Sequence, residues 1–384
     1  MDEGSRRMER ISQIQLFMLF ALFSYSTPSA FLVSPLAAVA KYDLCLAFVL
    51  AAAATLFILY FSIKLGRQQP AVFFADYGGE LVGKWLHSAF MVLFLFYFLQ
   101  RAAIVLRNIT DFMIQTQLPN TPSWAVAALF GLCIAFTIRS GIESIFRLSQ
   151  IFFIIIVLLI IGLTPLFLAF QLENKMMVAF LTNHNWRKLA LGTFQTIPWY
   201  GDTFLVLFLF PYLAQPHKTM RSLFWAVILG TVFILSYVIP TLLMFGPLLT
   251  ASLKYPVLEF IRSLRIADFI ETLDPFLTII WLPIIVLKIS LLLYTAIHCL
   301  MKVASLKDYK PLTYSMTTLM IGYSVHMAAN STELEAFILY SWPAFAITVQ
   351  CLPLLYLAAG WLRSQGRGKV KAKDNANREE ASTS

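Results

Sequence analysis

Long apolar stretches recur along the whole chain, and they restrict its fold more than any other feature. A helix that crosses the roughly 30 Å hydrocarbon core of a bilayer needs about 20 mostly apolar residues. Of the 384 residues, 59% are hydrophobic and 13% are charged, whereas a soluble domain has roughly 25% charged residues. The sequence therefore predicts an all-α membrane protein with no second, soluble domain.

Hydropathy predicts ten transmembrane spans, separated by Pro, Gly, Asn or charged residues. The predicted spans are residues 12–39, 44–65, 85–109, 123–138, 147–170, 189–213, 220–246, 275–303, 312–328 and 335–362. They form one domain over residues 12–362, after an N-terminal tail of residues 1–11. Residues 363–384 are polar and charged, so we expect a disordered C-terminal tail. The first span is too long for a signal peptide, so we expect an uncleaved helix.

Basic residues are distributed unevenly between the two sides of the predicted bundle. With the N-terminus inside and the C-terminal tail left out, 13 basic residues fall inside and 8 outside. This positive-inside bias predicts an even number of spans and places both termini in the cytoplasm. We assign the net charge of +9 to contact with membrane lipid, since the basic residues lie in short loops and tails. Nucleic acid is not an expected partner.

The segment at about residues 247–274, between spans seven and eight, is amphipathic. From Tyr255 to Leu273, apolar residues fall mostly three and four positions apart, with charged residues between them. This pattern predicts a helix that is too polar to span and lies on the external face. It is either an interfacial helix or a lid over an external vestibule.

Two spans carry helix-breaking residues at similar depth. Span six contains Pro198 and Gly201, and span one contains Pro28 within a run of Ser and Thr. The backbone groups that such breaks free are tolerated in a membrane only where they line a cavity or are buried in protein. Interrupted helices at matching positions of two halves point to a transporter-type binding site. The alternative is a pair of ordinary proline kinks.

Ionisable residues at mid-depth favour the cavity. Asp202 lies halfway along span six and Lys288 halfway along span eight, and each costs about 2.5–3.5 kcal/mol at the centre of a helix. We expect them to face each other and form an ion pair, which is either part of a ligand site or purely structural. The candidate ligand-binding residues are Ser24, Tyr25, Ser26, Thr27, Tyr97, Gln100, Thr196, Pro198, Tyr200, Gly201, Asp202 and Lys288.

Other polar and aromatic residues receive more ordinary interpretations. We expect Arg101 to lie nearer the outer surface and to extend toward it, and Trp199 to line the pocket. Four tryptophans near predicted span ends are interpreted as interfacial anchors. These are Trp85, Trp124, Trp342 and Trp361. The sequence shows no catalytic motif and no metal-ligand spacing, so we expect neither an enzyme nor a metal site.

Two motifs identify a family resemblance. One runs from Lys254-Tyr255-Pro256 through the amphipathic helix to Leu273-Asp274, and Trp281 follows in span eight. The other is Tyr200-Gly201-Asp202 followed by Phe210-Pro211-Tyr212. From Ile11 to Leu362, the chain resembles the B subunit of bacterial spore germinant receptors, the GerAB type, in the amino acid/polyamine/organocation permease superfamily. It departs from that family at Asp202, where Glu is usual, at Thr272, where Arg is frequent, and at the first break, which lacks glycine.

The resemblance implies a fold and a function. The fold has two inverted five-helix repeats of the LeuT-like type, with helices one and six interrupted around the ligand. The function is to bind a small germinant, commonly an amino acid, and to act with an A and a C subunit in the inner membrane of the spore. The alternative is an ion-coupled amino acid permease, in which helix-one carbonyls with Ser or Thr could hold sodium as the one cofactor. A lipid-modifying enzyme lacks any suitable acid, base or nucleophile cluster.

Overall fold

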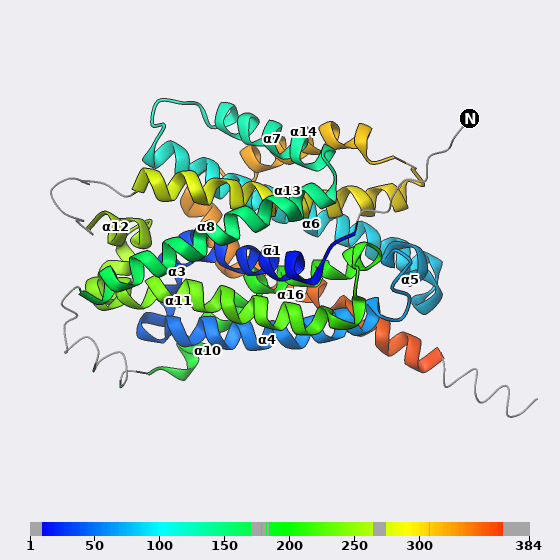
Figure 1. Cartoon of the computed structure of the whole chain (residues 1–384), viewed down its shortest axis with the longest axis horizontal. Helices are drawn as coiled ribbons and strands as arrows, with labels where there is room; N and C mark the ends of the chain where they lie inside the picture. Colours follow the sequence, from blue (N-terminus) through cyan, green and yellow to red (C-terminus); the bar gives the residue numbers. More distant parts are fainter. Residues whose placement is uncertain are drawn as a thin grey trace, which may run out of the picture.

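The computed structural model describes residues 10–169, 178, 182, 184–263, 274–306 and 308–363. This part of the chain is almost entirely helical, and most of the helices run along the long axis of the molecule (Figure 1). Residues 364–384 of the tail predicted to be disordered and residues 264–273 of the amphipathic segment lie outside the described residues, whereas Arg363 is helical. The beginning of that segment forms the helix α12 (Pro256–Ser263).

Each of the ten predicted spans coincides with a helical segment of the described chain. The first half contains α1 (Gln13–Ser26), α2 (Pro28–Phe31), α3 (Val33–Ala40), η1 (Lys41–Asp43), α4 (Leu44–Gly66), α5 (Phe74–Val82), α6 (Lys84–Thr116), α7 (Ser123–Arg139) and α8 (Ile142–Ala169). The second half contains α10 (Trp186–Gly201), η2 (Asp202–Tyr212), η3 (Pro216–Lys218), α11 (Thr219–Ser252), α12, α13 (Asp274–Val303), α14 (Lys310–His326), α15 (Ser331–Ala336), η4 (Phe337–Ser341) and α16 (Trp342–Gln350). Seven described segments are long and apolar enough to cross a membrane, and α7 is a shorter apolar helix.

The helices pack as two inverted repeats, which confirms the predicted fold class. In the first half, α1 packs against α8 and along α11 of the second half. In the second half, α10 packs in the matching way, against α16 and along α4 of the first half. The remaining central pairs, α6 with α13 and α7 with α14, join equivalent helices of the two halves. Each half therefore completes its packing only against the other.

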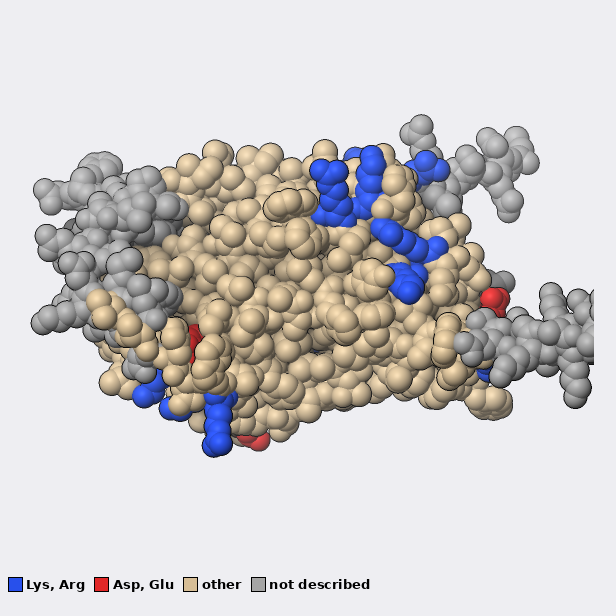
Figure 2. Space-filling model, turned by 90° about the horizontal axis from the view of Figure 1, so that it is seen from below, with Lys and Arg blue, Asp and Glu red and all other residues tan. Residues whose placement is uncertain are grey.

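Both ends of the described chain lie at the same end of the bundle, which we call the α5 end. Near the C-terminus, Arg363 donates to the carbonyl of Glu80 in α5 at 3.0 Å. Near the N-terminus, Ile11 pairs with Leu213 at the end of η2, and η2 reaches α5 through the contact of Phe208 with Phe74. The helix α12 lies at the opposite end (Figure 1). On the face drawn in Figure 2, basic side chains form two groups, one at lower left and one over the right half, with uncharged surface between them.

The interruptions predicted in helices one and six are present, and they differ in kind. The sixth helix changes from α-helix to 3₁₀-helix between Gly201 and Asp202, just after Pro198, which has no backbone donor. The first helix is divided at Thr27 and again at Leu32, although both residues keep right-handed helical backbone angles. Helix one is therefore kinked into three pieces and remains helical, while helix six changes its winding.

A third irregularity, in α11, provides a test of the fold. Gly246 has φ 66° and ψ 169° between two helical stretches, a conformation that only glycine adopts readily. We expect Gly246→Ala to destabilise the protein by about 1–3 kcal/mol, measured as a lower thermal unfolding midpoint in detergent. Gly162→Ala is the matched control, because a Cβ there meets no atom within 4 Å. Equal midpoints for the two variants would contradict this backbone geometry.

Candidate functional site

An ionic cluster lies at the centre of the bundle, formed by Arg101 of α6, Asp202 at the start of η2 and Lys288 of α13. Arg101 Nε lies 2.7 Å from Asp202 Oδ2, and Lys288 Nζ lies 3.7 Å from the same oxygen. All three side chains have 0% exposure. The predicted pairing of Asp202 with Lys288 is confirmed, but the closer partner of Asp202 is Arg101.

A neutral hydrogen-bond donor, Tyr97, also contacts Asp202 and is itself held in place by Gln350. The Tyr97 hydroxyl donates to Asp202 Oδ1 at 2.6 Å, and Gln350 Nε2 of α16 donates to the Tyr97 oxygen at 2.7 Å. The same amide nitrogen donates to the carbonyl of Pro198 at 3.0 Å, beside the break in helix six. A Cβ at Gly201 would overlap the Gln350 amide, so glycine is required there for α16 to approach. The break is thus held by side chains from α6 and α16.

The kink in helix one is held from α13. Lys288 Nζ donates to the carbonyl of Phe23 at 2.9 Å and to Thr27 Oγ1 at 2.8 Å. About two turns earlier on α13, the indole of Trp281 donates to the carbonyl of Ser26 at 2.7 Å. Backbone carbonyls around the kink are therefore satisfied by side-chain donors, as the low dielectric of a membrane requires.

The guanidinium of Arg101 packs against two indole rings, those of Trp199 and Trp342. Its central carbon is 4.6 Å from the ring centre of Trp199 and 4.8 Å from that of Trp342. Among the described residues, its Nη1 and Nη2 atoms are buried and have no hydrogen-bond acceptor. The π-helical turn η4 and Pro343, which has no backbone donor, immediately flank Trp342 and set its position over the arginine.

Two expectations about these residues were wrong. Arg101 was expected near the outer surface, but α6 extends to Thr116, beyond the predicted limit at residue 109, and this places Arg101 at mid-helix. Trp342 was expected at the membrane interface but is 1% exposed. Its helical segment begins at Ser331, earlier than predicted, so Trp342 lies deeper in the bundle. The other three tryptophans assigned to the interface are exposed.

The structure brings together only part of the predicted ligand set. Thr27, Tyr97, Pro198, Gly201, Asp202 and Lys288 meet at the cluster or at the two breaks. Other predicted residues make contacts elsewhere. Ser24 and Thr196 donate hydrogen bonds to carbonyls of their own helices, and Gln100 donates to the Tyr323 hydroxyl. Tyr25 packs on Phe233 and Tyr237, and Tyr200 packs on Phe48. Ser26 contributes its carbonyl to Trp281. That these residues bind a ligand stays a prediction. The sequence reading did not include Gln350, although an amide within an apolar span was a usable signal.

Cavities lie on both sides of the cluster along the bundle. A cavity of about 100 Å³ toward α12 is lined by residues that include Tyr25, Ser29, Tyr237 and Trp281. A cavity of about 520 Å³ at the α5 end is lined by residues that include Asp76, Tyr212, His298 and Lys302. Neither cavity has a lining residue from the ionic cluster. The polar hollow expected at the two breaks is neither of these cavities, and the three side chains of the ionic cluster have no exposed surface in the described chain.

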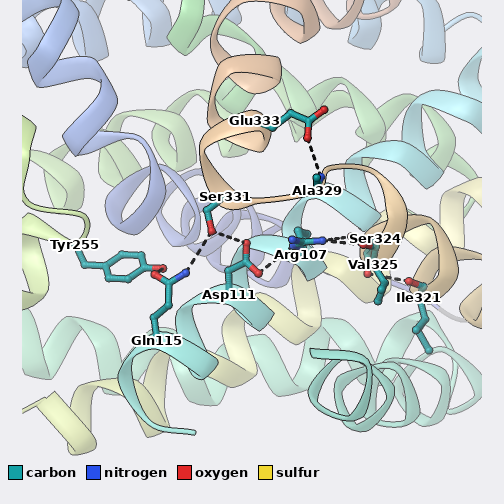
Figure 3. A network of polar contacts seen from close by, with 10 residues as sticks. All are labelled: Arg107, Asp111, Gln115, Tyr255, Ile321, Ser324, Val325, Ala329, Ser331 and Glu333. Carbon is teal, nitrogen blue, oxygen red and sulfur yellow. Dashed lines mark hydrogen bonds and ion pairs between the residues drawn. The ribbon is translucent and has the colours of Figure 1, made fainter. Parts of the chain in front are cut away.

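A polar network joins α6, α14, α15 and the residue before α12, and Figure 3 shows its contacts. Arg107 pairs with Asp111 at 2.9 Å and donates to the carbonyl of Val325 in α14 at the same distance. Ser331 of α15 donates to Asp111 at 3.2 Å and accepts from Gln115 at 3.3 Å. The Tyr255 hydroxyl, just before α12, donates to Gln115 at 3.2 Å. Burial raises the pKa of the Tyr255 phenol, so this donor stays protonated.

Comparisons with known proteins give one consistent result. A family model described as spore germination protein matches residues 10–332. Spore germination protein KB of Bacillus subtilis (strain 168) is 25% identical over 374 residues, which are 95% of this chain and 98% of that protein. Spore germination protein YndE of the same organism is 26% identical over 225 residues, 57% of this chain and 60% of that one. The crystal structure of MhsT in complex with L-phenylalanine covers 92% of this chain and 100% of that chain, with a TM-score of 0.58 and 16% identity, and shares the fold.

The charge balance of the cluster predicts unequal effects of removing its members. Asp202→Asn would leave two buried cations without an anion, and we expect it to lower the free energy of unfolding by about 3–5 kcal/mol. Lys288→Met keeps the Arg101–Asp202 pair and leaves two acceptors without a donor, so we expect a smaller loss of about 1–3 kcal/mol. Unfolding by titration with SDS measures both variants.

Lys302→Met is the control for this comparison, since Lys302 forms an exposed ion pair with Asp76. We expect it to change the free energy of unfolding by less than about 1 kcal/mol. A loss for Asp202→Asn no larger than that of Lys302→Met would show that the carboxylate does not hold the centre together.

Proposed function

This chain belongs to the family of spore germination proteins, and from that premise we propose that it is the transporter-like subunit of a spore germinant receptor. In this proposal it binds a small germinant, an amino acid, in the middle of the membrane and helps to trigger germination. It acts with the A and C subunits of the receptor in the inner membrane of the spore. The positive-inside bias supports a cytoplasmic α5 end and an external α12 end.

The observation that carries this proposal is the joining of the two interrupted helices through one ionic cluster. Asp202 belongs to the break in helix six, and Lys288 reaches both Asp202 and the kink of helix one. The two helices come from opposite halves of the fold. A ligand that exchanges contacts with this cluster would change how the two halves are held, and would favour one arrangement of the bundle over another.

The polar network at the α12 end fits a sensing role. The network around Asp111 joins α6, α14, α15 and the segment before α12. In the proposal, a germinant enters from the α12 end after this network opens. Binding then shifts the population of closed and open arrangements, and the partner subunits respond to that shift.

A working amino acid permease is the second candidate, and the shared fold with MhsT is the observation that favours it. A permease would couple the amino acid to a proton or to sodium held by helix-one carbonyls. Among the described residues, no group of three or more His, Cys, Asp or Glu could hold a metal ion. A sodium site would instead use backbone carbonyls and hydroxyls, and it stays a prediction.

The first test is ligand binding by the purified chain in nanodiscs. Thermal unfolding is measured with each of the twenty amino acids, and we expect a rise of the midpoint for one or a few of them. Thr27→Val removes the hydroxyl that meets Lys288, and we expect it to weaken that binding about 3- to 10-fold. Thr318→Val is the control, since its exposed hydroxyl bonds only the carbonyl of Tyr314 among the described residues. No response to any amino acid would refute the proposal.

The second test separates sensing from transport. The chain is reconstituted into liposomes, and uptake of the radiolabelled amino acid that raises the unfolding midpoint is followed with and without sodium and proton gradients. A receptor subunit is expected to give no uptake above protein-free liposomes, because binding is passed to partner subunits. Saturable, gradient-dependent uptake that Thr27→Val weakens would instead identify a permease.

A further inference from the structure

The buried centre of the bundle contains more cationic groups than anionic ones. Arg101 and Lys288 are both fully buried, and Asp202 is the one carboxylate within 4.0 Å of either of them in the described chain. An uncompensated charge at the centre of a membrane protein is costly and marks a functional site by default. The balance of this cluster is completed by one further negative charge.

The hydrogen-bond inventory shows where that charge would fit. Asp202 is already occupied, because Tyr97 donates to Oδ1 while Arg101 and Lys288 approach Oδ2. Lys288 is also occupied, by the Phe23 carbonyl and Thr27. Arg101 is different: it uses only Nε, and its Nη1 and Nη2 atoms find no acceptor among the described residues. The unused capacity of the cluster therefore consists of guanidinium donors.

The surroundings of Arg101 restrict the shape of the missing group. The rings of Trp199 and Trp342 lie 4.6 and 4.8 Å from the guanidinium carbon and are tilted by 80° to each other, so they limit access around it. Both Nη atoms are buried in the described chain, so the surrounding side chains must move before a ligand reaches them. Two parallel N–H groups on a planar edge match the two oxygens of a carboxylate.

We propose that Arg101 is the carboxylate-recognising residue of the ligand site, a specificity role that rests on the proposed function. The ligand brings a carboxylate that binds Arg101 Nη1 and Nη2 beside Trp199 and Trp342, and so supplies a second negative charge. Asp202 then acts as a positioning residue: it holds Arg101 through Nε and leaves Nη1 and Nη2 without an acceptor among the described residues. This arrangement differs from a direct contact of the ligand's ammonium with Asp202.

The test compares each amino acid with its primary amide, which lacks the carboxylate charge, by thermal shift on the full chain in nanodiscs. We expect the amino acid that binds to lose about 10-fold or more in affinity as its amide. In Arg101→Met we expect this preference to fall below about 3-fold, because the charge-assisted bonds are gone. Equal affinities of acid and amide for the unaltered chain would overturn the inference and leave the proposed function in place.

Arg139→Met is the matched control, because Arg139 also lies over an aromatic ring, that of Tyr314, at 4.8 Å, but at the end of α7. It should keep the full preference for the acid. If Arg101→Met does not fold, Arg101→Lys is used instead, because it keeps the charge but lacks the planar pair of N–H groups. We expect its preference for the amino acid over the amide to drop at least several-fold. An unchanged preference in Arg101→Lys would overturn the inference.

Acetate and chloride separate this inference from the proposed function. If no amino acid binds, the proposed function fails, and sodium acetate still tests Arg101. We expect acetate to raise the unfolding midpoint of the unaltered chain and not of Arg101→Met, while sodium chloride at equal ionic strength has no such effect. Equal effects of acetate on both proteins, or of chloride and acetate on the unaltered chain, would show that no carboxylate-specific site exists.

Discussion

A carboxylate without exposed surface needs donors from neighbouring helices, and at Asp202 these donors determine how the centre of the bundle is assembled. Tyr97 and Arg101 come from α6, and Lys288 comes from α13, which packs along α6. The first residue of η2 is thereby fastened to the central pair of helices. Because Lys288 continues to the Phe23 carbonyl and Thr27, the same contacts also fix the kink of helix one.

The two interrupted helices present opposite ends to the cluster, and their polar partners differ accordingly. At the end of α1 the available groups are carbonyls, which carry partial negative charge, and they meet the ammonium of Lys288 and the indole of Trp281. At the start of η2 the backbone carries partial positive charge, which favours the Asp202 carboxylate at that position. The Asp202 carboxylate thus comes from an interrupted helix, while its cationic partners come from α6 and α13.

Sequence reasoning could predict the features that depend on composition along the chain. The apolar spans, the amphipathic start of α12 and the irregular winding near Pro28 and Pro198 follow from local patterns. The depth of a side chain in the membrane, and the direction in which it points, do not follow from local patterns. For example, α6 extends seven residues past its predicted limit at residue 109, to Thr116, and this places Arg101 in the middle of the bundle. A long helix tilts or protrudes to fit a bilayer, and hydropathy does not tell by how much. The same reason explains the wrong placement of Trp342.

The helix α6 links the centre to the α12 end through residues on its own length. Its 33 residues span about 50 Å at 1.5 Å per residue, and they carry Tyr97 and Arg101 at the cluster and Arg107 and Asp111 in the polar network. A helix satisfies its backbone hydrogen bonds internally and moves as a unit. A change in the position of Arg101 therefore also moves Asp111 relative to Ser331 of α15, to which it is bonded. In the proposed function, one continuous helix would therefore couple occupation of the cluster to the polar network at the α12 end.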